Sequence, residues 1–143
     1  MIGSRSKDPF DHVWSEDKAL DRDSPEFHPE KYFQTFKPEH MPIREGRTPT
    51  RFKIRPLSRK RFIAISGMAP ADRANAAVSY GVIGIENFRL PTGSMLVPEF
   101  GGQGADLHLL PTTLDLIFDP SLFGELMTVI MSASGLDPLA DAG

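Results

Sequence analysis

The stretch that decides the fold runs from Asp119 to Gly135 and reads DPSLFGELMTVIMSASG. Asp119 is suited to the N-cap of a helix, because its carboxylate can accept hydrogen bonds from the first backbone N–H groups. Pro120 then falls at the first helical position, where the missing N–H of proline costs nothing. The pattern predicts a helix that Gly135 ends in a left-handed conformation. Its apolar residues are spaced three and four apart and therefore share one face: Leu122, Phe123, Leu126, Val129, Ile130 and Ala133.

The composition indicates one small domain with extensions. The chain has 143 residues and no cysteine, so we expect neither disulfides nor a thiolate metal site. We find no apolar run of about 18 residues and no apolar core of a signal peptide near the start. We therefore expect no membrane span. Thirteen prolines and twelve glycines indicate several short elements joined by defined turns.

Charge is distributed unevenly along the chain. Residues 1–49 carry eight basic and ten acidic side chains, whereas residues 62–143 carry two basic and nine acidic ones. A basic stripe beside an acidic remainder favours contact with an acidic partner, or head-to-tail contact with a second copy of the chain. The stripe lies within residues 50–61, which contain six basic residues and no acidic one: Arg51, Lys53, Arg55, Arg59, Lys60 and Arg61.

Residues 1–49 are predicted to form an extended, proline-rich polar arm. No helical or strand period lasts there, and such a segment buries too little surface to offset the cost of ordering itself. Spaced aromatic side chains are nevertheless suited to anchor an arm. The surface that receives them is either another protein or the core of this chain, and the sequence favours neither. These aromatic anchors are Phe10, Trp14, Phe27, Tyr32, Phe33 and Phe36.

Residues 50–138 are predicted to form a compact, mainly helical α+β domain, followed by a flexible tail over 139–143. In the segment 50–57 apolar and basic residues alternate, which is typical of a strand with one buried face. We expect Phe118 to point into the core and the glycine-rich segment 101–104 to be a flexible break. The expected elements are a strand over 50–57, helices over 59–66, 70 to about 81 or 84, 111–118 and 120–134, and a β-hairpin over 88–97.

No pattern of catalytic or metal-binding residues stands out. The four histidines lack close metal-ligand spacing, and CxxC, HExxH and EF-hand patterns are missing. GGQG at 101–104 is neither GxGxxG nor a Walker A loop. We therefore predict a protein that is not an enzyme, with no catalytic residue, no metal and no cofactor.

The basic stripe leaves nucleic-acid binding as the alternative function, because a strand followed by a helix could present these side chains to phosphates. Two observations weigh against it. The sequence pI is about 5.8, and aromatic residues do not alternate with the basic ones as in proteins that bind single strands. A protein partner is therefore favoured over nucleic acid.

The order of these parts resembles the small tail-assembly-chaperone-like proteins of tailed bacteriophages, over about residues 50–138. Three stretches carry the resemblance: RPLS at 55–58, GIENF at 84–88 and ELMTVIMSASGL at 125–136. It implies a non-enzymatic morphogenesis protein in the host cytoplasm that binds other phage proteins, such as the tape-measure protein. It implies no catalytic residues. The long arm departs from a minimal chaperone and leaves room for a virion subunit that docks on its neighbours.

The final helix offers a further prediction about the partner surface. Its apolar face is wide, and the two helices expected over 59–66 and 70–81 offer mostly alanine and a few isoleucines to cover it. We therefore predict that part of this face, around Met127 and Met131, contacts a partner protein.

Overall fold

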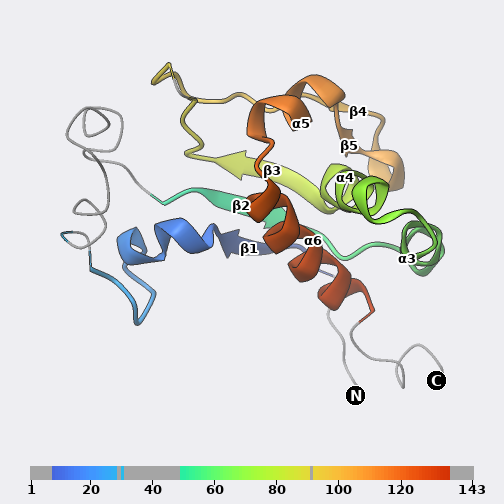
Figure 1. The fold of residues 1–143 in the computed structure, drawn as a ribbon, viewed down its shortest axis with the longest axis horizontal. Helices are drawn as coiled ribbons and strands as arrows, with labels where there is room; N and C mark the ends of the chain where they lie inside the picture. Colours follow the sequence, from blue (N-terminus) through green and yellow to red (C-terminus); the bar gives the residue numbers. More distant parts are fainter. Residues whose placement is uncertain (1–7, 29, 31–48, 91, 136–143) are drawn as a thin grey trace. The chain divides into compact units, whose positions relative to one another are not determined.

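The computed structural model describes residues 8–28, 30, 49–90 and 92–135. Within these residues it contains four α-helices and two small β-sheets (Figure 1), which confirms the predicted α+β, mainly helical class. The chain divides into two compact units. The helical unit comprises Met1–Phe10, Lys53–Ile83 and Pro98–Gly143, and the small unit comprises Asp11–Phe52 and Gly84–Val97.

The four helices of the helical unit begin and end close to their predicted positions: α3 Arg59–Ser66, α4 Pro70–Gly81, α5 Pro111–Ile117 and α6 Pro120–Ser134. Side-chain caps just before the first residues of α3 and α6 explain why the sequence predicts where these two helices begin. The Ser58 hydroxyl accepts a hydrogen bond from Arg61 N at 3.2 Å. The Asp119 carboxylate accepts from Ser121 N at 2.8 Å and from Leu122 N at 3.1 Å, so the predicted N-cap of α6 is confirmed.

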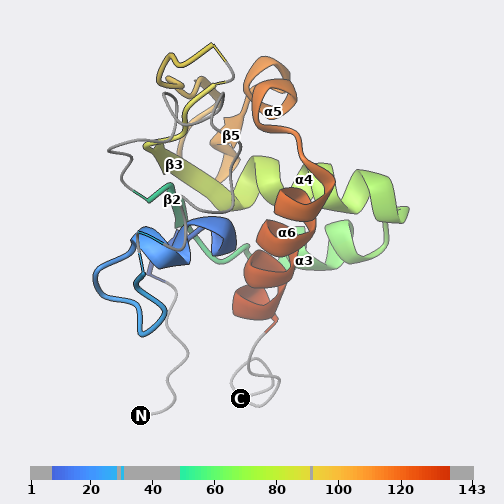
Figure 2. The same cartoon turned by 60° about the vertical axis from the view of Figure 1, so that its left-hand side comes forward.

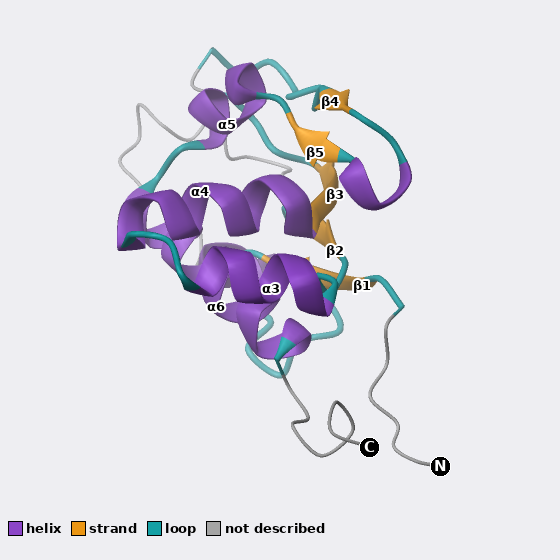
Figure 3. Cartoon of the chain, turned by 90° about the vertical axis from the view of Figure 1, so that its right-hand side faces the viewer, coloured by secondary structure: helices purple, strands orange, loops and turns teal. Residues whose placement is uncertain are grey.

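Helix α4 lies at the centre of the helical unit and packs against α3, α6 and β5. Figure 2 shows α6 crossing α4, and Figure 3 shows α3 beside α4. Gly81 permits the close approach of α6, because a Cβ atom at this position would lie 2.5 Å from Ile130 Cδ1. The buried apolar core of this unit consists of Ile54, Leu57, Ile65, Ala77, Val78, Val82, Leu109, Ile117, Leu122, Phe123, Leu126 and Ile130.

The segment predicted as a flexible break is ordered. Strand β4 (Phe100–Gly101) pairs with β5 (His108–Leu109) in an antiparallel sheet, and the 3-10 helix η3 (Gly104–Asp106) lies between them. Gly102 has φ +67°, and a Cβ atom there would lie 2.4 Å from Asp106 O. Glycine is therefore required for a tight turn here rather than for flexibility.

The sheet β1-β2-β3 is built from β1 (Phe10–Val13), β2 (Arg51–Ile54) and β3 (Val82–Glu86), and the boundary between the two units falls within these strands. Strand β2 is shorter than the predicted strand over 50–57. Strand β3 was not predicted: α4 ends at Gly81, and the β-branched residues of VIGIE then continue as a strand.

Within the predicted arm, the chain is extended in β1, and a 3-10 helix, η1 (Ser15–Leu20), follows. Two hydrogen bonds to Thr50 hold this segment in place. The Thr50 N–H donates to the buried Asp17 carboxylate at 2.9 Å, and the Thr50 carbonyl accepts from Trp14 N at 3.0 Å. These contacts connect residues more than thirty positions apart, and no local pattern shows them.

The hairpin predicted over 88–97 is present as a single antiparallel bridge between Arg89 and Met95. Two further backbone hydrogen bonds support it, from Leu90 N to Ser94 O and from Leu96 N to Phe88 O, both at 2.8 Å. Pro91 lies outside the described residues.

Two predictions about single residues are wrong. Gly135 does not adopt a left-handed conformation, since its φ is −104°. Glycine is needed there for space, because a Cβ atom would lie 2.6 Å from Phe62 Cζ. Phe118 does not point into the core: it is 60% exposed and contacts Phe123 edge-on, with the ring centroids 5.1 Å apart.

In the described part of the chain, no single helix is long and apolar enough to cross a membrane; α5 and α6 meet that criterion only as a pair, which bends by 116°.

Candidate partner-binding sites

Arg55 is half-buried in the helical unit, and its guanidinium donates to four backbone carbonyls. Its Nε donates to Tyr80 O at 2.9 Å, and Nη1 donates to Gly104 O at 2.7 Å. Nη2 donates to Leu107 O at 2.6 Å and to Ala105 O at 3.3 Å. The Arg55 side chain therefore fastens η3 and its flanking residues to the end of α4.

Arg61 lies next to this cluster, on the first turn of α3. Its guanidinium carbon is 3.8 Å from the centroid of the Tyr80 ring, a cation–π distance. Nη2 forms an ion pair with Asp106 at 3.1 Å, in which the Asp106 side chain is 83% exposed. Arg61 therefore has one aromatic neighbour and one carboxylate neighbour that is mostly in water.

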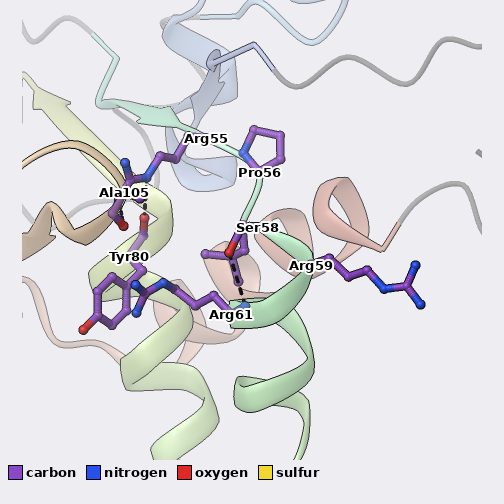
Figure 4. A pocket seen from close by; sticks show the side chains of 8 residues that line it. Arg55, Pro56, Ser58, Arg59, Arg61, Tyr80 and Ala105 are labelled. Atoms are coloured by element: carbon purple, nitrogen blue, oxygen red, sulfur yellow. Dashed lines mark hydrogen bonds between the residues drawn. The ribbon is translucent and has the colours of Figure 1, made fainter. Parts of the chain in front are cut away.

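These side chains line a pocket of about 430 Å3, which we call the arginine pocket. Figure 4 shows the Arg61 guanidinium over the Tyr80 ring and the Arg55 guanidinium directed toward Ala105. The side chain of Arg59 points away from both. The lining residues are Arg55, Pro56, Leu57, Ser58, Arg59, Arg61, Tyr80 and Ala105. The RPLS stretch that carries the phage resemblance thus forms half of the lining.

The arginine pocket is electropositive. Burial lowers the pKa of Arg55 below its ordinary value, the positive charge of Arg61 lowers it further, and the Asp106 carboxylate acts in the opposite direction. Arg55 nevertheless stays protonated, because arginine keeps its proton in proteins. Among the residues that the structure describes, no acidic side chain lines this pocket.

A second pocket, the methionine groove, has a volume of about 330 Å3 and is lined by Ser66, Arg73, Met127, Thr128, Met131 and Ser132. It lies where α6 meets the end of α3 and the first turns of α4. Met127 and Met131, predicted from the sequence as partner contacts, are half-buried and share this groove. The structure therefore brings these two residues together in a concave surface.

Arg73 is the polar feature of the methionine groove. Its Nη2 donates to Met68 O at 3.1 Å. Its Nε is buried, and no acceptor among the described residues lies within hydrogen-bond distance. An unpaired buried N–H costs about 1–3 kcal/mol. Because Nε is enclosed by the protein, an incoming segment meets the positive charge of the Arg73 guanidinium and not this N–H.

Exposed apolar residues extend the rim of the methionine groove. Ile63 is 57% exposed, and it precedes Ser66 by one helical turn, so the two side chains are neighbours on the surface of α3. Met68, which follows α3, is 38% exposed.

The predicted aromatic anchors have different surroundings. Trp14 stacks on Phe88 of the same chain, with the ring centroids 6.0 Å apart, so this anchor docks within its own unit. Phe10 is 37% and Phe27 is 42% exposed. The remaining three, Tyr32, Phe33 and Phe36, lie outside the described residues.

The other residues of the basic stripe also differ in their surroundings. Arg51 forms an ion pair with Asp21 at 3.2 Å within the small unit. Lys53, Arg59 and Lys60 are exposed. The stripe is therefore not one continuous basic face: Arg55 and Arg61 belong to a pocket, and Arg51 already contacts a carboxylate.

Among the residues of these sites that sequence reasoning missed, Arg73 and Tyr80 matter most for the chemistry. Arg73 is one of only two basic residues in 62–143, and its isolation in an alanine-rich helix was the available signal. Tyr80 gave no comparable signal, because its role depends on Arg61 folding over its ring. In the described part of the chain, no group of three or more histidine, aspartate or glutamate side chains is placed to hold a metal ion.

No family model matches the sequence, and comparison with curated proteins and with solved structures finds no match.

Proposed function

We propose that this protein is a non-enzymatic morphogenesis protein of a tailed phage, acting by protein–protein binding in the host cytoplasm, and that the methionine groove receives a segment of another phage protein. The observation that carries the proposal is the groove itself, in which Met127 and Met131 share the lining with the cationic side chain of Arg73. The sequence resemblance supplies the biological context, in which the tape-measure protein is the expected partner.

The chemistry of the groove indicates what kind of segment it binds. Methionine side chains are flexible and polarisable, so they adapt to apolar side chains of different shape. Arg73 contributes a positive charge to the lining, and this charge favours a carboxylate on the partner. We therefore infer a partner segment that presents a large apolar side chain close to an aspartate or glutamate.

Two fates are compatible with this binding. A tail assembly chaperone holds an aggregation-prone partner until it is packaged and then leaves, whereas a virion subunit stays and docks on its neighbours, which include other copies of the chain. Mass spectrometry of purified particles separates the two fates, because stoichiometric presence identifies a virion component.

Nucleic-acid binding through residues 51–61 has less support. Affinity for nucleic acid depends on the number of phosphates that free cationic side chains neutralise. Arg51 contacts Asp21, and the Arg55 guanidinium donates to four backbone carbonyls. Two of the three basic side chains of the predicted strand are thus not presented on an open face to a polyanion, because Arg51 is ion-paired and Arg55 lines a pocket.

Site-specific photo-crosslinking during infection tests the proposal. A photo-reactive amino acid replaces Thr128, which is exposed and lines the methionine groove. The matched control carries the same amino acid at Leu116, which is 53% exposed on α5 and does not line the groove. We expect a crosslink to a tail protein from position 128 and a much weaker one from position 116.

The crosslinked peptide also tests the inferred chemistry, since mass spectrometry identifies its sequence. A peptide with an apolar residue near an aspartate or glutamate supports the proposal. Equal crosslinking from both positions, or crosslinks from position 128 that never reach a phage structural or assembly protein, would overturn it.

A further inference from the structure

We propose that the arginine pocket binds a phosphate group carried by a small molecule, seated against the guanidinium groups of Arg55 and Arg61. This site shares no lining residue with the methionine groove, and the proposal does not depend on the proposed function.

The first argument is the concentration of positive charge. Arg55 and Arg61 both line the pocket, and the pKa of Arg55 is lowered by burial and by the positive charge of Arg61. Backbone carbonyls satisfy the hydrogen bonds of Arg55 but do not remove its net charge. An anion in the pocket relieves the repulsion between the two guanidinium groups.

The second argument is that Arg61 can take an additional oxyanion. A guanidinium has five N–H donors in a planar fork that suits phosphate and carboxylate oxygens. The ion pair with Asp106 uses Nη2. Because the Asp106 side chain is 83% exposed, water weakens this pair, and a stronger anion can displace it.

A phosphate group should bind Arg61 more strongly than the Asp106 carboxylate does, for two reasons. It carries between one and two negative charges at neutral pH, and it has three acceptor oxygens, so it can contact two guanidinium groups at once. The first turn of α3 strengthens the preference, since it contains no acidic residue and its positive dipole end lies at Ser58, in the lining of the pocket.

The size of the arginine pocket points to a small molecule. Ligand pockets in proteins commonly enclose about 300–1,000 Å3, and this pocket has about 430 Å3. That volume exceeds the need of a phosphate ion alone. A long polyanion is disfavoured, because residues 62–143 carry nine acidic and only two basic side chains.

Titration of the full chain with inorganic phosphate, followed by two-dimensional 1H–15N NMR, tests this site. Sodium chloride at equal ionic strength is the reference. We expect saturable shifts of the Arg61 side-chain N–H and of the backbone amides of residues 58–61. A second titration with phenyl phosphate tests whether a small molecule carries the phosphate: tighter binding than inorganic phosphate supports this, and equal or weaker binding contradicts it.

Three variants sharpen the test. Arg61→Ala removes a guanidinium from the pocket and should weaken phosphate binding about tenfold or more. Lys60→Ala removes the same charge from the same helical turn, but Lys60 does not line the pocket, so we expect less than about a twofold change. Asp106→Asn removes the internal competitor and should tighten binding several-fold, which a purely structural role of Arg61 does not predict.

The outcomes that overturn the proposal are specific. Shifts that do not saturate, or that sodium chloride reproduces, exclude a site. Equal weakening by Arg61→Ala and Lys60→Ala indicates a diffuse charge effect instead of a pocket. If Arg61→Ala fails to fold, Asp106→Asn decides alone: unchanged or weaker phosphate binding in that variant rejects the proposal.

Discussion

Gly81 sets the distance between α4 and α6. Its missing side chain leaves room for Ile130, which packs directly over the backbone of α4. Gly124 in α6 is the opposite case, because no atom lies within 4 Å of the position where its Cβ would be. The two glycines therefore make a matched pair: close packing requires the first, and nothing in the described structure requires the second.

We predict that Gly81→Ala destabilises the fold and that Gly124→Ala stabilises it. Overpacking against Ile130 should lower the free energy of unfolding by about 1–3 kcal/mol, more than alanine gains in helix propensity. Gly124→Ala should gain up to about 1 kcal/mol, because glycine is a poor helix former. Urea denaturation followed by circular dichroism measures both.

The double variant Gly81→Ala, Ile130→Ala is the control for this mechanism. With the Ile130 side chain shortened, the added methyl group has room, and the cost of Gly81→Ala should disappear in the double-mutant cycle. A cost that persists would contradict the steric explanation.

Arg55 shows what a local pattern cannot reveal about a residue. In sequence it alternates with apolar neighbours and looks like a solvated charge on a strand. In the structure its acceptors are carbonyl groups 25 to 52 residues away. Arg61 illustrates the same limit, because its contacts with Tyr80 and Asp106 also depend on the assembled fold. Arg55 and Arg61 were therefore predicted as members of a basic stripe, but the pocket that they line was not predicted.

Among the elements, the four helices were predicted well because their signals are local. Ser58 and Asp119 act as caps, and Pro70, Pro111 and Pro120 begin their helices. The strands β3, β4 and β5 contain only two to five residues, and their pairing depends on distant segments. Such strands carry little pattern of their own, so the sequence did not reveal them.

The Asp119 cap at the N-terminus of α6 should contribute measurably to stability. Asp119→Ala removes the acceptor of the hydrogen bonds from Ser121 N and Leu122 N. The free energy of unfolding should fall by about 1 kcal/mol. Asp119→Asn keeps a side-chain oxygen and should retain most of the stability. Thermal unfolding of the two variants checks this, and an equal loss in both would show that the negative charge, not the hydrogen bonds, stabilises α6.

At the scale of the whole molecule, the arginine pocket and the methionine groove are concave sites with different chemistry. The methionine groove combines apolar side chains with one cationic side chain, whereas the arginine pocket concentrates positive charge. The sequence predicted Met127 and Met131 as partner contacts from the excess width of the apolar face of α6. It did not predict Arg73, whose relation to that face depends on how α4 packs against α6.

The central claim is that Met127 and Met131 serve binding more than folding. Its most direct test is the affinity of the double variant Met127→Asp, Met131→Asp for the partner segment identified by crosslinking, with Leu116→Asp as the control. The account predicts binding at least about tenfold weaker in the double variant, unchanged in the control, and a native circular dichroism spectrum in both. Unchanged affinity of the double variant, or its failure to fold, would contradict the claim.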